Sequence, residues 1–174
     1  MVQNIKIAVA LGANLGDRLA TLRRAANRLS HDLLLNSRSS SVYESDPWGI
    51  LEQPKFLNAV LVGDCEWKPP AIVNFLKQLE LELGRKPGPR FGPREIDLDL
   101  IAYGNEVWES PGVVVPHPEM AKREFVLAPL NELWGDWQHP RLLCSVHVLC
   151  QSLFGSEPQH ARFFAPPLQD TRTP

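Results

Sequence analysis

The chain has 174 residues, of which 44% are hydrophobic and 22% are charged, and its formal net charge is −2. This length and composition are typical of one soluble domain with a sizeable core. The charge balance provides no general basic field for nucleic acid, and no apolar run approaches the roughly 20 residues of a membrane span. The first residues lack the layout of a signal peptide, and three scattered cysteines are too few for a disulfide framework. We therefore expect a cytoplasmic protein that binds neither nucleic acid nor membrane.

The first predicted strand covers residues 5–11, where large apolar residues alternate with smaller or polar ones. It leads into Gly12–Asp17, a loop whose glycine spacing matches neither a dinucleotide fingerprint nor a P-loop. A tight turn is therefore favoured over a phosphate-binding loop. Asp17 can cap the helix that follows, whose apolar face recurs at helical spacing over residues 19–29.

Two segments then suggest a binding region. Arg38–Tyr43 predicts a polar edge strand, and the loop after it holds Trp48 among proline and glycine. An aromatic residue in such a loop often marks a binding lid, and packing of the ring onto the core is the alternative. The next predicted strand, Phe56–Val62, is apolar except for Asn58. A buried asparagine needs hydrogen-bond partners, which either its own backbone or the amide-like edge of a flat heterocycle could supply.

A basic loop followed by an acidic strand is the most informative stretch of the chain. Pro69 and Pro70 open a predicted helix that ends near Gly84, and four cations follow within ten residues. In the strand after this loop, Asp97 and Asp99 fall on one face, with their Cα atoms roughly 6–7 Å apart. Two such carboxylates form either a solvated pair or a Mg²⁺ site. The nearby arginines favour the second interpretation, because proteins bind a polyphosphate with arginine side chains and a metal ion together.

The last third of the chain predicts shorter elements. Tyr103–Glu106 indicates a hairpin turn, with residues 106–108 as its short return arm. His117 lies between two prolines, six residues before Arg123, and a helical turn between them could aim both side chains at one ligand. We expect a short helix at 128–133 and a last amphipathic helix at 143–153. We expect a single domain over 1–154 and a loose, proline-rich tail over 155–174.

Four ordered blocks of sequence resemble the 6-hydroxymethyl-7,8-dihydropterin pyrophosphokinase family of folate biosynthesis. The resemblance covers residues 5–133, and its blocks are Leu11–Gly16, Gln53–Ala59, Arg90–Ile101, and Val115–Pro118 together with Arg123–Leu130. It implies an α+β fold, in which a ferredoxin-like antiparallel sheet has helices on both faces in three α/β/α layers. It also implies transfer of the β,γ-pyrophosphoryl group of ATP to the hydroxymethyl group of the pterin, with release of AMP.

The resemblance assigns roles to the matching positions. It implies that Asp97 and Asp99 hold two Mg²⁺ ions, with Arg85 and Arg94 beside them in the catalytic centre. It places ATP against charged and apolar residues of the later blocks: Glu80, Arg85, Arg90, Phe91, Arg94, Leu100, His117 and Arg123. It places the pterin ring between Phe56 and Phe125, and the polar edge of the pterin against Ser45, Asp46, Trp48 and Asn58.

Two positions differ from many family members, which carry Trp at position 91 and Tyr at position 56. The phenylalanines found here keep the stacking surface and lack the polar group. Two rival functions are a Mg²⁺-dependent phosphohydrolase and a catalytically inactive ferredoxin-like ligand-binding module. Aromatic residues suited to a pterin argue against the first, and intact Asp97, Asp99 and Arg94 argue against the second. We expect a monomer whose partners are ATP and a reduced pterin alcohol.

Overall fold

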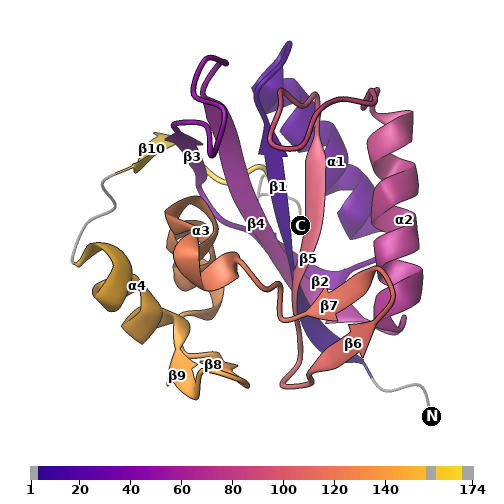
Figure 1. Ribbon diagram of the computed structural model, residues 1–174. Coiled ribbons are helices and arrows are strands. Elements are labelled where there is room, and N and C mark those ends of the chain that lie inside the picture. The colour runs from indigo at the N-terminus through magenta and orange to yellow at the C-terminus, as the bar shows by residue number, and fades with distance from the viewer. Residues whose placement is uncertain (1–3, 156–159, 170–174) are drawn as a thin grey trace.

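A six-stranded antiparallel sheet lies at the centre of the computed structural model, which describes residues 4–155 and 160–169 (Figure 1). The main path of the sheet runs β10-β3-β4-β1-β5, and β2 and β3 pair with successive parts of β4. The strands are β1 (Ile5–Ala13), β2 (Leu35–Ser39), β3 (Val42–Ser45), β4 (Phe56–Cys65), β5 (Asp97–Tyr103) and β10 (Ala161–Ala165).

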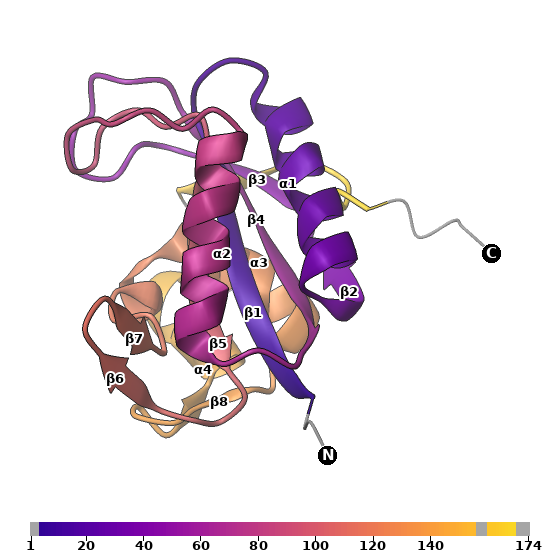
Figure 2. The same cartoon turned by 90° about the vertical axis from the view of Figure 1, so that its right-hand side faces the viewer.

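Helices cover both faces of this sheet, which confirms the predicted α+β fold and its three layers. Figure 2 shows α1 (Arg18–Asp32) and α2 (Pro69–Glu82) side by side on one face. The other face carries α3 (Glu124–Trp134) and α4 (Val146–Phe154). The sheet has one hydrophobic core on each face, and the side chains of β1 point alternately into the two. The odd-numbered residues 7–11 of this strand pack with α1 and α2, whereas Ala8 packs with the apolar residues of α3 and α4.

Local sequence signals account for the ends of the helices. Asp17 caps α1 as predicted, because its Oδ1 accepts a hydrogen bond from the Ala20 amide at 3.0 Å. Prolines occupy the first positions of α2, and Gly84 follows that helix with a φ of +96°. No helix within residues 4–155 and 160–169 has both the length and the apolar character needed to cross a membrane.

Two short hairpins and one turn complete the fold and correct one prediction. Trp108–Ser110 (β6) pairs with Val113–Val115 (β7), so the expected return arm does not pair with β5, although a turn follows Tyr103. Gln138–His139 (β8) pairs with Cys144–Ser145 (β9). Met120–Lys122 forms a 3-10 turn, η1, between His117 and Arg123, which confirms the helical turn predicted there. The predicted short helix at 128–133 is the later part of α3, which begins earlier than predicted, at Glu124, and ends at Trp134.

The predicted edge strand and the predicted loose tail are both corrected by β10. The segment Arg38–Tyr43 is divided between β2 and β3, and β3 is not an edge because β10 pairs with it on its other side. The tail is therefore ordered as a strand over Ala161–Ala165, and Leu168 is buried beyond it. Residues 156–159 and 170–174 of the expected tail lie outside the described residues.

Candidate active site

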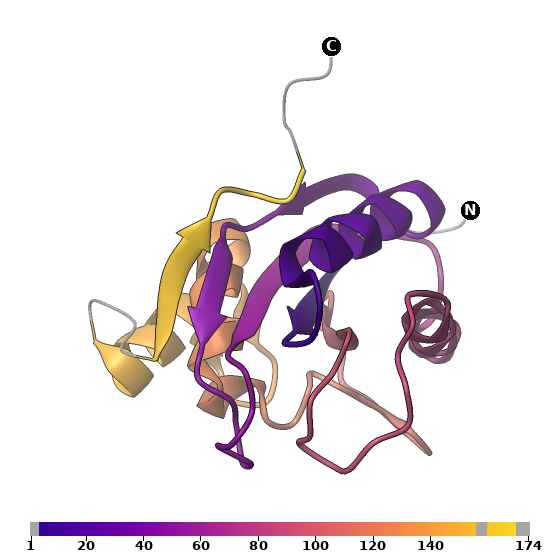
Figure 3. The same ribbon diagram turned by 90° about the horizontal axis from the view of Figure 1, so that it is seen from above.

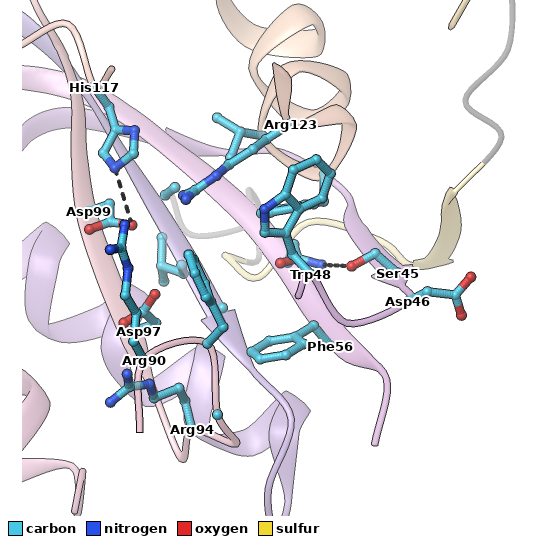
Figure 4. A pocket seen from close by; sticks show the side chains of 18 residues that line it. Ser45, Asp46, Trp48, Phe56, Arg90, Arg94, Asp97, Asp99, His117 and Arg123 are labelled. Atoms are coloured by element: carbon cyan, nitrogen blue, oxygen red, sulfur yellow. Dashed lines mark hydrogen bonds and ion pairs between the residues drawn. The ribbon is translucent and has the colours of Figure 1, made fainter. Parts of the chain in front are cut away.

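The two carboxylates predicted from the sequence lie side by side at the start of β5. Asp97 Oδ1 is 2.8 Å from Arg85 Nη1. Asp99 Oδ2 is 4.0 Å from His117 Nε2 (Figure 4). Burial and the charge of Asp99 raise the pKa of the Asp97 carboxyl, and burial raises the pKa of Asp99. Two carboxylates that disfavour each other's ionisation form a site that a divalent cation stabilises.

The residues present fit Mg²⁺ as a metal shared with a substrate. Within residues 4–155 and 160–169, no group of three or more His, Cys, Asp or Glu side chains could hold a metal ion. Magnesium is commonly held by one or two carboxylates, with phosphate oxygens and water completing its coordination. Asp97 and Asp99 match that donor set.

His117 presents a neutral imidazole to the same place. Its Nδ1 accepts a hydrogen bond from the Glu119 amide at 3.2 Å, so the ring proton belongs on Nε2, which faces Asp99. Burial, and then the positive charge of Arg123, lower the pKa of His117 to about 4. The side chain is therefore an uncharged hydrogen-bond donor at neutral pH.

Arg123 lies opposite β5 and retains unused hydrogen-bonding capacity. Its Nε is buried and has no hydrogen-bond partner among the described residues. A buried donor without a partner is costly, and an anionic ligand would satisfy it. Arg123 also lines the cavity that Asp97 and Asp99 line, so the arrangement is suited to phosphate oxygens.

Glu80 lies behind the site rather than in its open part. The carboxylate is buried, forms an ion pair with Arg85, and accepts a hydrogen bond from the Leu98 amide at 2.7 Å. Burial raises the pKa of Glu80 to about 7, against the opposing effect of its hydrogen bond from Leu98 and the charge of Arg85. Glu80 therefore fixes the position of Arg85 through the ion pair and that of β5 through the Leu98 amide.

One cavity collects all the residues predicted to contact a pterin. It runs from β4 across β1 to the first turn of α3, and Asp97 and Asp99 lie at one of its walls (Figure 4). The predicted pterin residues that line it are Ser45, Asp46, Trp48, Phe56, Asn58 and Phe125. Of the residues predicted to contact ATP, those that line it are Arg90, Phe91, Arg94, His117 and Arg123.

The floor of this cavity combines an amide with an unusually small residue. Asn58 is buried, and its Nδ2 donates to Ser45 Oγ at 2.9 Å, so its partner is a side chain and not its own backbone. A Cβ atom at Gly12 would lie 3.5 Å from Asn58 Oδ1 and 3.8 Å from the Phe56 ring. Gly12 belongs to β1, so the predicted loop begins later than expected. The missing side chain leaves room for a flat ligand beside the Asn58 amide.

Two loops close over the cavity and are linked by hydrogen bonds that the sequence did not indicate. Gln53 Nε2 donates to the Phe91 carbonyl at 2.8 Å, and Asn14 Nδ2 donates to Gln53 Oε1 at 3.0 Å. Gly49, with a φ of +88°, lets the first loop approach closely, because a Cβ there would lie 3.1 Å from Phe91 Cβ. Trp48 lines the cavity and is 49% exposed, so the ring does not pack into the core.

A second cavity meets the first at the carboxylates. Arg94, Asp97, Asp99 and His117 line both cavities, and Glu80, Arg85 and Leu100 line the second one only. Its apolar wall comes from α2 and β7 and was not predicted as part of a site: Val73, Leu76, Val113, Val114 and Val115. The signal for these residues was weak, because ordinary core packing explains apolar residues in a helix and a strand equally well.

Comparison with known proteins gives a single family. The family described as 7,8-dihydro-6-hydroxymethylpterin-pyrophosphokinase (HPPK) matches residues 8–135. The 2-amino-4-hydroxy-6-hydroxymethyldihydropteridine pyrophosphokinase of Bacillus subtilis is 41% identical over 126 residues, which are 72% of this chain and 75% of that protein.

Longer relatives contain the same region as one part. The mitochondrial folate synthesis bifunctional protein of Arabidopsis thaliana is 38% identical over 130 residues, and the match covers 75% of this chain and only 24% of that relative. The crystal structure of wild-type Plasmodium falciparum HPPK-DHPS has a similar fold, with a TM-score of 0.68 and 12% identity, over 86% of this chain and 45% of that one.

Proposed function

Because the chain belongs to the 7,8-dihydro-6-hydroxymethylpterin-pyrophosphokinase family, we propose that it transfers pyrophosphate from ATP to 6-hydroxymethyl-7,8-dihydropterin. The products are AMP and the pterin diphosphate, in folate biosynthesis. The observation that carries the proposal is the meeting of two cavities at Asp97 and Asp99. One cavity has an aromatic and amide lining suited to a pterin, and the other has cations and apolar residues suited to a nucleotide.

The pterin would occupy the first cavity. Phe56 and Phe125 offer aromatic faces to its ring, and Asn58 and Ser45 offer polar groups to its amide edge. The phenylalanine at position 56 supplies stacking area without a hydroxyl group. Asp46 and Trp48 belong to the loop that covers this cavity, so they would contact the pterin at its entrance.

The triphosphate would lie between the two cavities. Asp97 and Asp99 would hold two Mg²⁺ ions, and those ions would neutralise the negative charge of the phosphates. Arg123 and Arg94 would bind phosphate oxygens through charged hydrogen bonds, and the neutral His117 would donate one from Nε2. Leu100 and the apolar wall of the second cavity would contact the nucleoside.

In the reaction, the hydroxymethyl oxygen of the pterin forms a bond to the β-phosphorus of ATP. The bond between that phosphorus and the oxygen bridging to the α-phosphorus breaks, and AMP leaves with the oxygen while the hydroxyl proton passes to solvent. Positioning of the two substrates and neutralisation of charge supply most of the catalysis in such transfers. Arg85, bound to Asp97 and Glu80, and Arg90, in the covering loop, would stabilise this charge.

The proposal also covers the state of the protein. We place the active domain in residues 1–154, and β10, from the segment after it, adds a strand to the edge of its sheet. We expect a monomer in the cytoplasm, whereas the Arabidopsis relative is named as mitochondrial.

One experiment separates the proposed reaction from its two rivals. Protein, ATP, Mg²⁺ and the reduced pterin alcohol are mixed, and AMP is measured with and without the pterin. The proposal requires AMP that depends on the pterin and is lost in the double variant Asp97→Asn, Asp99→Asn. Hydrolysis of ATP without pterin would indicate the phosphohydrolase, and ligand binding without AMP would indicate the inactive module.

A further inference from the structure

Glu124 stands between two residues of the candidate site and points away from them. Arg123 and Phe125 line the first cavity, whereas the Glu124 carboxylate is buried on the other side of the first turn of α3. Its Oε1 accepts hydrogen bonds from the amides of His160 at 2.8 Å and Ala161 at 3.2 Å. A single side-chain oxygen therefore anchors the start of β10.

The same point of β10 is attached to the opposite wall of the cavity. Ala161 pairs with Ser45 at the end of β3, and Ser45 accepts the hydrogen bond from Asn58 at the cavity floor. Figure 3 shows β10, in yellow, running alongside β3 at the edge of the sheet, next to α3. The start of β10 thus connects the helix turn that carries Phe125 with the strand end that carries Ser45.

The far end of the segment has a separate anchor. The Leu168 amide donates to Ser39 Oγ at 2.8 Å, and Ser39 is buried in β2, outside both cavities. Between these two side-chain anchors, β10 pairs with β3. Of the two anchors, only Glu124 adjoins residues that line the site. In each anchor the side chain, Glu124 or Ser39, lies within the family match, whereas the segment that it holds lies beyond the last matched residue, 135.

We propose that Glu124 is a positioning residue for the pterin, acting through β10. By holding β10 against α3, it fixes the separation between Phe125 and Ser45, which bound the space that the pterin ring would enter. The inference rests on the proposed function. Arg123 is held independently, because its amide donates to the Met120 carbonyl at 3.1 Å within η1. The binding of ATP should therefore depend on Glu124 less than the binding of the pterin does.

A purely structural role for Glu124 makes a different prediction. An acid in the first turn of a helix stabilises that helix whatever the ligand, so its loss would lower thermal stability without separating the two substrates. Glu124→Gln removes the charge and keeps an oxygen that can accept both amide hydrogen bonds. Glu124→Ala removes both features, so the pair distinguishes the hydrogen bonds from the charge.

The test measures KM for the pterin, KM for ATP and kcat in wild type, Glu124→Ala, Glu124→Gln and Ser39→Ala. We expect Glu124→Ala to raise the pterin KM about tenfold, with ATP KM changed less than about twofold, because charged hydrogen bonds are lost beside one cavity only. The pterin KM of Glu124→Gln should be much closer to that of wild type than to that of Glu124→Ala. Ser39→Ala should lower the melting temperature and leave both KM values within about twofold, because it loosens only the far anchor.

The outcomes separate this inference from the proposed function. A wild-type protein without pterin-dependent AMP production overturns both. An active wild type, together with a folded Glu124→Ala variant that has an unchanged pterin KM or equal changes in both KM values, overturns the positioning role alone. If Glu124→Ala does not fold, His160→Pro removes the shorter of the two hydrogen bonds by removing its donor, the backbone N–H of residue 160. It must raise the pterin KM selectively, and an unchanged pterin KM then refutes the inference.

Discussion

Replacing Asn58 with alanine should weaken binding of the pterin and leave binding of a non-hydrolysable ATP analogue almost unchanged. The amide is buried at the floor of the first cavity and does not line the second. One N–H of its Nδ2 is bonded to Ser45, so its Oδ1 and the second N–H of Nδ2 are available to a ligand. Loss of a buried hydrogen-bond partner costs about 1–3 kcal/mol, which corresponds to roughly a 5- to 150-fold loss of affinity.

Titration calorimetry on the folded variant provides the measurement, first with the ATP analogue and Mg²⁺, then with the pterin added. Ser45→Ala is the comparison, because it breaks the same protein hydrogen bond at 2.9 Å and leaves the Asn58 amide in place. Its loss of pterin affinity should be the smaller of the two. Equal losses for both ligands in Asn58→Ala would show that Asn58 supports the structure only, and the assignment of its amide to the pterin would be refuted.

Three further predictions concern charged groups. Asp97→Asn or Asp99→Asn should preserve the melting temperature and lower turnover by at least ~100-fold, since metal-assisted charge neutralisation contributes several kcal/mol; near-normal turnover in a folded variant would contradict the metal assignment. Arg90→Ala should lower kcat more than ATP affinity, and amides within Arg85–Gly92 should gain protection from hydrogen exchange with ATP analogue and pterin; equal protection in both states would argue for a rigid loop. Burial raises the pKa of Glu80 from 4.5 to about 7, so its ionisation disfavours the fold. The stability of Glu80→Gln relative to wild type should therefore increase as the pH rises from 4.5 to about 7, as thermal melts will show.

Sequence reasoning succeeded where the signal was local. The alternation of β5 places Asp97 and Asp99 on one face whatever the rest of the chain does, and the expected sheet and helices follow from similar periodicities. The residues expected around the pterin also line one cavity, because the blocks that contain them converge at the ends of β1, β3 and β4.

The failures involve contacts between distant parts of the chain. Nothing in Ala161–Ala165 distinguishes it from a loose tail, because its order depends on pairing with β3 and on the buried Glu124. Likewise, β6 pairs with β7 instead of β5, and only the three-dimensional course of the chain decides between them. The network of Asn14 and Gln53 was missed for the same reason, since polar loop residues carry no periodicity.

The hydrogen bonds of Gln53 have a consequence for how this protein can vary. One amide side chain joins the loop that covers the first cavity to the basic loop at the Phe91 carbonyl, and Asn14 holds that amide in place. The sequences of the two loops are therefore constrained together. A replacement at 53 would loosen both at once, and an insertion in either loop would have to preserve the reach of this side chain. We expect natural variation in one loop to be accompanied by compensating change in the other.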